Sequence, residues 1–500
     1  MKTSQFNKRM ASIILIASMG IIFSQCAKNS DCEYTTSGCI ETETAGYMVG
    51  TMAADQRSIN PNSVAVLYKT LQNALAPIGE NWNDPSAGVN RVQRDFPANW
   101  NSNRMGNVFG IALDHNNGIF LSATDVYKFD ASLPNLLSQV ILWSSSVGSA
   151  GAAGIYYTNY SSINTTVDLV TTLNVASANT VNTNQIPSTG FSTSTGNSIG
   201  NIAFDFKNNQ LFATNLEDGR IYRIDPVTGK IKSILDPFVL DNAIAGIAPI
   251  GEQLWGISVY TQAGITKVYM ARSTMAHSAN IPVPNGGVEI WSVNLTASGE
   301  FDATSAGSGL FTAPTASSTF KQEIKLTSGT QTKVTDIEFS NAGRMMLAER
   351  GHPHRAGVYE FVYTGGSWTT GNNFYLGFDL SLHGAPNVLA AKNAAGGVDY
   401  ANRQSRDLSS YKCDDIVWAS GNAMATTSLV VFGGYPNYVY GVQGMSGAGN
   451  NATLSINQTN DLYIDYNCTG WPHYNNPPTQ TETVKGKIGD VDVFDQCACK

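Results

Sequence analysis

The 500-residue sequence has little charge. Charged residues make up 14% of the chain, against roughly 25% in an average soluble domain. Lys plus Arg number 30 and Asp plus Glu 38, for a net charge of −8. A nucleic-acid-binding protein would carry a basic patch, so this balance argues against nucleic acid as a partner. We expect the abundant Asn, Ser, Thr and Gly to keep the chain soluble in place of charge.

The sequence also lacks the motifs that name a reaction. It contains no phosphate-binding loop, no dinucleotide fingerprint and no C-x-x-C-H haem site. Residues 196–200 satisfy G-x-S-x-G, but a nucleophile elbow needs a strand before it and a helix after it. A Ser/Thr-rich loop precedes this segment and a strand-like segment follows. We therefore assign no catalytic residue from sequence.

Long apolar runs are absent except at the start of the chain. Lys2, Lys8 and Arg9 precede an apolar run at residues 11–23, which suits a signal peptide and is short for a membrane-spanning helix. We expect residues 1–25 to be a signal peptide, residues 26–43 a cysteine-containing segment, and residues 44–500 a single domain. The protein is predicted to be exported, with its body outside the membrane.

The seven cysteines are few and odd in number. The segment ending the apolar run, Phe23 to Cys26, resembles the lipobox of bacterial lipoproteins, although Leu and a small residue are usual where Phe23 and Gln25 stand. The resemblance implies a lipid anchor on Cys26 and an outer-membrane or cell-surface location. Ordinary cleavage and secretion is the alternative. Lipidation would leave six cysteines, enough for three disulfides: Cys32, Cys39, Cys413, Cys468, Cys497 and Cys499.

A repeat of about 45 residues organises the rest of the chain. Residues 110–124, 201–215 and 336–350 align without a gap, and each reads as strand, polar turn, strand. Their first apolar anchors, Ile111, Ile202 and Ile337, lie 91 and 135 residues apart, close to two and three times the period. Further anchors are predicted at Ile155, Ile247, Ile416 and Val491, with a possible eighth at residues 288–293.

Short strands in units of 40 to 50 residues are typical of β-propeller blades, which stack around an axis and share a core. Residues 204–230 closely resemble blades of the bacterial NHL and SMP-30-like group. Four further segments resemble uncharacterised bacterial cell-surface propeller-like domains: residues 351–354, 396–400, 413–419 and 488–493. The prediction is an all-β propeller of seven blades, with six or eight as alternatives.

The last anchor lies too close to the chain end to begin a complete blade. We expect strands from residues 44–100 to complete that blade and close the ring. This closure would bring Cys32 and Cys39 near Cys497 and Cys499, where disulfides could lock the seam. A zinc site made by these four thiols is the alternative, although an oxidising compartment favours disulfides.

Polar residues at equivalent hairpin positions form the candidate site. Asp336, Asp415 and Asp490 directly precede anchors, and Glu349 ends a hairpin. Carboxylates that converge on a channel mouth can bind Ca²⁺ through oxygen, and the SMP-30 resemblance implies a cation that polarises a lactone or ester. Asn201 is expected on the same rim, together with the ligand-binding candidates Asn215, Arg350, His352 and His354.

Two hypotheses about function remain open. The first is a non-enzymatic surface propeller that binds a protein or glycan through a rim, where Trp255, Trp291, Trp418 and Trp471 could contribute aromatic contacts unless they pack between blades. In that case the aspartates satisfy loop N–H groups. The second is a cation-dependent hydrolase of the SMP-30-like type, with a metal held by Asp336, Glu349, Asp415 and Asp490.

Overall fold

The computed structural model describes the following parts of the chain: residues 47–54, 62–69, 93–124, 148–173, 199–216, 218–238, 254–273, 287–302, 319–326, 333–350, 356–378, 391–401, 414, 416–425, 438–450, 462–465 and 487–494. Within these residues, no helix has the length and apolar character needed to cross a membrane. All seven cysteines lie outside them. The lipidation and disulfide assignments therefore stay predictions.

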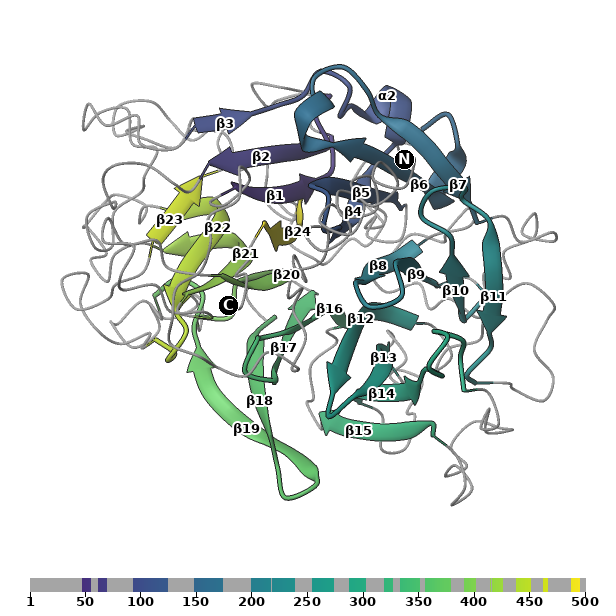
Figure 1. Cartoon of the computed structure of the whole chain (residues 1–500). Helices are drawn as coiled ribbons and strands as arrows, with labels where there is room; N and C mark the ends of the chain where they lie inside the picture. Colours follow the sequence, from purple (N-terminus) through teal and green to yellow (C-terminus); the bar gives the residue numbers. More distant parts are fainter. Residues whose placement is uncertain are drawn as a thin grey trace, which may run out of the picture.

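Six four-stranded antiparallel sheets surround a common axis (Figure 1). Each sheet is one blade and is named here by its innermost strand. The β24 blade contains β24 (Ile488–Val493), β1 (Tyr47–Met52), β2 (Ala65–Lys69) and β3 (Gln93–Asp95). The β4 blade contains β4 (Val108–Leu113), β5 (Gly118–Ala123), β6 (Gly154–Asn159) and β7 (Asp168–Thr172). The β8 blade contains β8 (Ile199–Asp205), β9 (Gln210–Asn215), β10 (Arg220–Ile224) and β11 (Ile231–Leu235).

The other three blades follow in chain order. The β12 blade contains β12 (Leu254–Gln262), β13 (Ile265–Ser273), β14 (Val288–Asn294) and β15 (Lys321–Leu326). The β16 blade contains β16 (Lys333–Phe339), β17 (Arg344–Arg350), β18 (Val358–Thr364) and β19 (Ser367–Phe374). The β20 blade contains β20 (Ala394–Ala401), β21 (Ile416–Ala425), β22 (Tyr438–Ser446) and β23 (Leu462–Asp465). Short helical turns are α2 (Ser102–Met105), η2 (Gly151–Ala153) and η3 (Tyr160–Ser162).

The all-β propeller is confirmed, but the prediction of seven blades is wrong. Ile111, Ile202, Ile337 and Val491 lie on innermost strands as expected, whereas Ile155 lies on the third strand of its blade and Ile416 on the second. Residues 288–293 likewise belong to a third strand, β14, and Ile247 lies outside the described residues. Any buried propeller strand alternates apolar and small residues, so the anchor pattern alone cannot distinguish the innermost strand from its neighbours.

The two ends of the described chain meet in one blade. β24 pairs antiparallel with β1, with Met48 opposite Val493 and Gly50 opposite Val491. β2 and β3 complete the sheet, so its other strands come from residues 47–95. This is the closure expected from the sequence. Because the first and last described strands share one blade, the ring of blades is closed.

Apolar side chains fill the spaces between blades. The buried residues form six clusters. Five of them join two neighbouring blades, and the cluster between the β12 and β16 blades also takes in Phe109, Leu216 and Ala53. A blade thus buries both of its faces only by stacking on its neighbours. The predicted rim tryptophans Trp255, Trp291 and Trp418 belong to these clusters, and their packing role explains their burial; Trp471 lies outside the described residues.

Candidate functional site: a sealed axis

Every innermost strand carries a β-bulge near the same place. In five blades the register shift ends directly before an apolar residue of the innermost strand: Val491, Ile111, Ile202, Ile257 and Val398. In the β16 blade it lies between Val334 and Asp336, one residue earlier relative to Ile337. A bulge inserts extra residues and re-aims side chains. The bulge brings two consecutive residues of each strand to the axis: Gly489-Asp490, Phe109-Gly110, Gly200-Asn201, Trp255-Gly256, Thr335-Asp336 and Gly396-Gly397.

The second residue of each dipeptide alternates around the ring between a polar side chain and glycine. Asp490, Asn201 and Asp336 come from the β24, β8 and β16 blades, and a glycine-bearing strand lies between each two of them. Each glycine makes room for the polar residue of the next blade. A Cβ on Gly110 would collide with Asn201 Oδ1, one on Gly256 would lie 2.9 Å from Asp336 N, and one on Gly397 would lie 2.6 Å from Asp490 Oδ1. Three polar groups therefore fit where six would not.

The two acids use both carboxyl oxygens to bind backbone N–H groups. Asp336 Oδ1 accepts from Ile337 N (2.9 Å) and Oδ2 from Val398 N of the next blade (2.8 Å). Asp490 repeats this arrangement, with Oδ1 accepting from Val491 N (2.9 Å) and Oδ2 from Ile111 N of the next blade (3.3 Å). Each acid thus holds its own bulge and the neighbouring one.

Asn201 occupies the third equivalent position with an amide in place of a carboxylate. Its Oδ1 accepts from Ile202 N (2.8 Å), and its Nδ2 donates to Thr335 O (2.9 Å), Asp336 Oδ1 (3.4 Å) and Asp490 Oδ2 (3.3 Å). A third carboxylate would place like charges together in a buried site. The amide instead supplies the donor that joins the two acids.

The acids are almost fully buried, at 5% exposure for Asp336 and 3% for Asp490. Burial, followed by the negative charge of Asp490, raises the pKa of Asp336 well above its usual value. Burial, followed by the charge of Asp492, raises the pKa of Asp490 in the same direction. The two carboxyls hydrogen-bond to each other. The pair therefore keeps a proton at pH values where exposed carboxyls are ionised.

Hydroxyl groups one strand further out tie the same residues together. Thr51 Oγ1 accepts from Asp490 N (2.8 Å) and donates to Phe109 O (2.5 Å). Thr214 Oγ1 makes the equivalent bonds with Asn201 N (3.0 Å) and Trp255 O (2.7 Å). In each case one hydroxyl joins a blade to its neighbour: Thr51 joins the β24 and β4 blades, and Thr214 joins the β8 and β12 blades.

Aromatic and basic side chains occupy the adjacent layer of the axis. Phe109 and Trp255 precede the glycines of their strands and are buried. Arg350 donates to the carbonyls of Ala395 and Ile488, and its guanidinium carbon lies 5.4 Å from the centroid of the Phe109 ring. Lys333 Nζ lies 5.6 Å from the Trp255 ring, and burial lowers the pKa of Lys333 to about 7. These side chains are buried next to the polar layer.

The structure brings together only part of the predicted site. Asp336, Asp490 and Asn201 meet, whereas Glu349 is buried within its own blade, where its Oε2 accepts from Gly357 N (3.0 Å) and Tyr359 Oη (3.1 Å). Asn215 is buried at the end of β9. Arg350 is buried beside the seam instead of facing solvent on a rim. Asp415, His352 and His354 lie outside the described residues.

The arrangement does not fit a Ca²⁺ ion. Calcium needs six to eight oxygen ligands, yet all four oxygens of the two acids accept backbone N–H groups, and Asn201 presents its N–H₂ group to them. No group of three or more His, Cys, Asp or Glu residues within the described part of the chain could hold a metal ion. The polar centre is built to join blades.

Comparison with protein-family models and with curated sequences finds no match. Among solved structures, a nidogen/laminin complex matches with a TM-score of 0.38 and 10% identity, over 89% of this chain and 97% of the other. A gluconolactonase from Xanthomonas campestris matches with a TM-score of 0.31 and 10% identity, over 71% and 76%. TolB from Acinetobacter baumannii matches with a TM-score of 0.31 and 8% identity, over 85% and 68%. The assignment to the β-propellers rests on the chain's own six sheets.

Proposed function

We propose that this chain is an exported binding module that presents a protein or glycan ligand-binding surface on a closed six-bladed ring. The observation that carries this proposal is the sealed axis. Asp336 and Asp490, which could have served as a metal site or as catalytic groups, bind backbone N–H groups of neighbouring blades and are themselves buried. Ligand binding is therefore assigned to the outer surfaces of the blades.

The internal bonds of the ring suit this role. A binding surface is most precise when rigid elements hold it, and the Asp336, Asn201 and Asp490 contacts join blades that are not adjacent. The β24 strand also closes the ring through its pairing with β1. A ligand that bridges two blades would therefore meet a preformed surface.

The export signal and Cys26 extend the proposal to location. A signal peptide over residues 1–25 and a lipid on Cys26 would hold the ring at a membrane surface, with the blades in the aqueous phase. Incorporation of labelled fatty acid into the wild-type chain, and its loss in Cys26→Ser, tests the anchor. Equal labelling of both chains would contradict it.

A cation-dependent hydrolase is the alternative hypothesis. It would use Asp336, Asp490 and the carbonyl oxygen of Thr335 as oxygen donors, with Glu349 and Asp415 as the further ligands predicted from sequence. This function requires the metal to displace the hydrogen bonds from Ile337, Val398, Val491 and Ile111. It also requires a path for substrate to the buried pair.

One preparation of the wild-type mature chain separates the two hypotheses. Lactone and ester hydrolysis is measured with and without Ca²⁺, and the same protein is applied to arrays of glycans and of extracellular proteins. The binding hypothesis predicts saturable binding to an array member and hydrolysis at background. Calcium-dependent turnover that disappears in Asp336→Ala, with that variant still folded by near-UV circular dichroism, would establish the hydrolase instead.

A further inference from the structure

One tryptophan differs from the others in the described residues. Trp368 on β19 is partly exposed, with its outer surface in contact with solvent. The other described tryptophans are buried: Trp100, Trp255, Trp291 and Trp418. Because a buried tryptophan serves packing, Trp368 is the described tryptophan that has surface available for a ligand.

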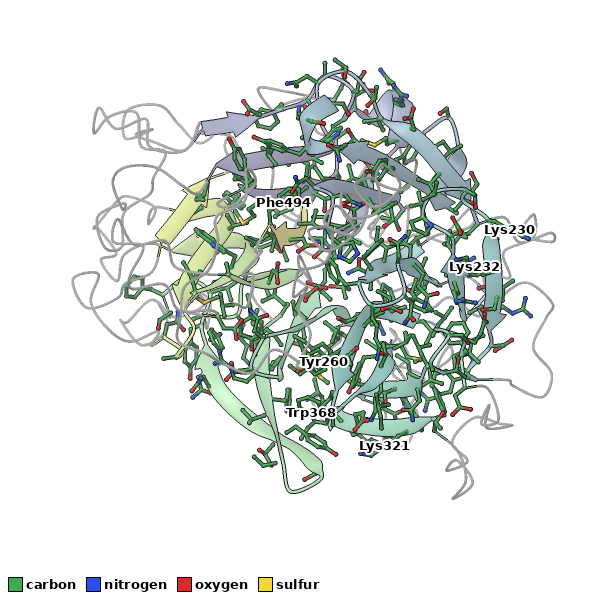
Figure 2. All side chains as sticks on the ribbon, viewed as in Figure 1. Lys230, Lys232, Tyr260, Lys321, Trp368 and Phe494 are labelled. Carbon is green, nitrogen blue, oxygen red and sulfur yellow. The ribbon has the colours of Figure 1, made fainter. Side chains whose placement is uncertain are left out.

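Trp368 belongs to an aromatic stack that reaches the perimeter from the interior. Tyr260 and Phe339 stack between the β12 and β16 blades with ring centroids 4.3 Å apart. Phe339 lies 6.0 Å from Trp368, and Trp368 lies 5.1 Å from Tyr363, its partner across the β18–β19 hairpin. Figure 2 shows Tyr260, Trp368 and Lys321 succeeding one another toward the outside of the ring. The interior rings fix the orientation of the outer pair.

The outer strand that carries Trp368 also has an unusual composition. β19 contains no charged residue, while each of the other five outermost strands contains at least one. Edge strands are normally protected by charged side chains, Lys above all. The exposed side chains of β19 are hydroxyls and amides: Ser367, Thr369, Thr370, Asn372 and Asn373. The β18–β19 hairpin extends beyond the neighbouring blades in Figure 1, which leaves this surface accessible.

We propose that Trp368, Tyr363 and the hydroxyl of Thr370, which share one face of the β18–β19 hairpin, form a platform for a neutral oligosaccharide. A ring face is apolar and carries partial negative charge, so it attracts the C–H face of a sugar ring. Hydroxyl and amide groups both donate and accept hydrogen bonds, which matches the hydroxyls of an uncharged sugar. Lys321 Nζ lies 6.0 Å from the centroid of the Tyr363 ring and pairs with Glu323 at 2.9 Å, so this cation already has an anionic partner.

This inference rests on the proposed binding function and names its ligand class. The test uses the mature wild-type chain with neutral cello-, xylo-, manno- and malto-hexaose as probes, measured by titration calorimetry. We expect at least one probe to bind, and Trp368→Ala to weaken that binding by about tenfold or more. Trp368→Phe, which keeps an aromatic face, should retain most of the affinity. Val227→Ala, an exposed apolar change in the β10–β11 turn, should have no effect.

A second readout follows the indole itself. Trp368 is the described tryptophan most open to acrylamide quenching, and the bound hexaose should reduce that quenching in wild type but not in Trp368→Phe. Failure of all four hexaoses to bind, while the chain still binds a member of the protein array, would overturn this inference and leave the proposed function standing. If the chain bound neither a hexaose nor a member of the protein array, both this inference and the proposed function would be overturned.

The competing occupant is a β-strand of another protein added to the β19 edge. Thr369→Lys places a charge on that edge, on the opposite face from Trp368, and leaves the aromatic pair in place. Protein binding that is lost in Thr369→Lys and kept in Trp368→Ala would assign β19 to strand pairing, which would overturn the glycan platform.

Discussion

At the residue scale, the position before each anchor decides how the ring holds together. A glycine at this position leaves room for the polar side chain of the next blade. A polar residue there hydrogen-bonds to other blades, and the two residue types alternate around the axis. Asn201 shows the rule most clearly, because an amide stands where the arrangement of Asp336 and Asp490 would place a third acid. Its two N–H groups let two carboxyls share one buried site.

The first prediction concerns this amide. Asn201→Asp removes the donor to Thr335, Asp336 and Asp490 and adds a carboxyl to a buried acid pair. We expect a loss of about 3 to 5 kcal/mol in the free energy of unfolding, as for a broken buried charge network. Urea unfolding followed by tryptophan fluorescence measures it. Asn373→Asp, the same change on an exposed strand, should cost less than about 0.5 kcal/mol, and an equal effect of both changes would contradict this role for Asn201.

The second prediction concerns the pH dependence caused by Lys333. Burial lowers its pKa from 10.5 to about 7, so the folded state binds the proton less well than the unfolded state. Burial of Lys333 therefore lowers the free energy of unfolding by an amount that depends on pH. This loss is absent above about pH 10.5, grows as the pH falls, and reaches its full value at about pH 7. Lys333→Met should therefore stabilise the protein by more than about 1 kcal/mol at pH 6, and the gain should vanish near pH 10. A gain that does not change with pH in denaturant unfolding would contradict the assignment.

At the scale of strands, the sequence predicted the hairpins better than their order within a blade. The strand pairs that begin at Ile111, Ile202 and Ile337 are found where the alternation of apolar residues placed them. Ile155 and Ile416 were assigned to the wrong strand because third and second strands are equally buried. The true innermost strand of the β20 blade, with Gly396-Gly397 before Val398, lacks the polar residue that marked other anchors.

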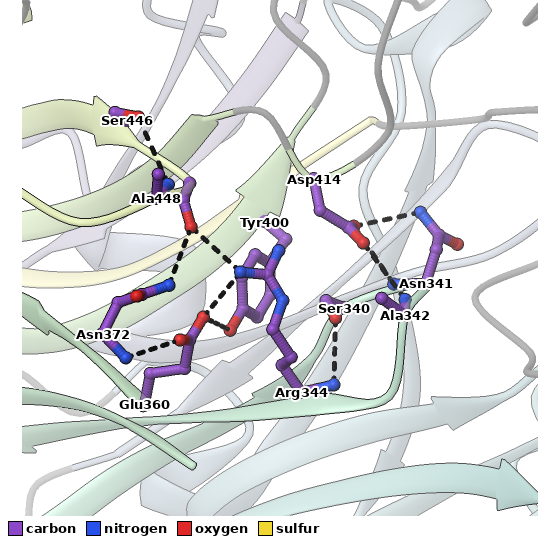
Figure 3. Close-up of polar contacts among 11 residues, drawn as sticks. Ser340, Asn341, Ala342, Arg344, Glu360, Asn372, Tyr400, Asp414, Ser446 and Ala448 are labelled. Atoms are coloured by element: carbon purple, nitrogen blue, oxygen red, sulfur yellow. Dashed lines mark hydrogen bonds and ion pairs between the residues drawn. The ribbon is translucent and has the colours of Figure 1, made fainter. Parts of the chain in front are cut away.

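Contacts between neighbouring blades also depend on single side chains at strand ends. Arg344 at the start of β17 donates to Glu360 Oε1 (3.0 Å) and to Gly447 O of the β20 blade (2.9 Å). Tyr400 Oη and Asn372 N also bind the Glu360 carboxylate, at 2.9 and 2.8 Å. Figure 3 shows this group, in which the Glu360 side chain is fully buried. Arg344 is thus the partner that neutralises a buried charge.

The third prediction tests this interblade contact. Arg344→Met should cost about 3 kcal/mol in the free energy of unfolding, because it leaves the buried Glu360 carboxylate without its cation. Adding Glu360→Gln should recover part of the loss. Lys232→Met breaks the ion pair with Asp225, in which both side chains are partly exposed, and should cost less than about 1 kcal/mol. If Glu360→Gln added its own full cost to that of Arg344→Met, the two residues would be acting independently and the contact would carry no coupling.

At the scale of the whole molecule, composition and repeat length predicted the architecture and its closure, but not the number of blades. Variable segments between strands stretch the period, so dividing the chain by 45 residues cannot count the sheets. Asp336 and Asp490, which the sequence placed together on one rim of the ring, meet at the axis through Asn201. Their hydrogen bonds to backbone N–H groups of other blades could not be predicted, because they arise from the bulges and the ring geometry.

The hydrolase hypothesis and the binding-module hypothesis give different roles to the acidic residues. Acidic residues in equivalent positions suggested a metal site, and the structure uses two of them, Asp336 and Asp490, to join neighbouring blades. Trp368 was not singled out from sequence, because nothing local distinguishes an exposed tryptophan from a buried one. Its place on an outermost strand without charge becomes visible only when the six blades are compared.

Calcium titration of the wild-type mature chain by calorimetry tests the sealed axis most directly. The fully bonded Asp336 and Asp490 predict no stoichiometric binding at pH 7 and no rise in melting temperature with added Ca²⁺. One Ca²⁺ bound per chain, with a higher melting temperature and with both effects lost in a folded Asp490→Asn variant, would show that the axis is a metal site and would contradict the account.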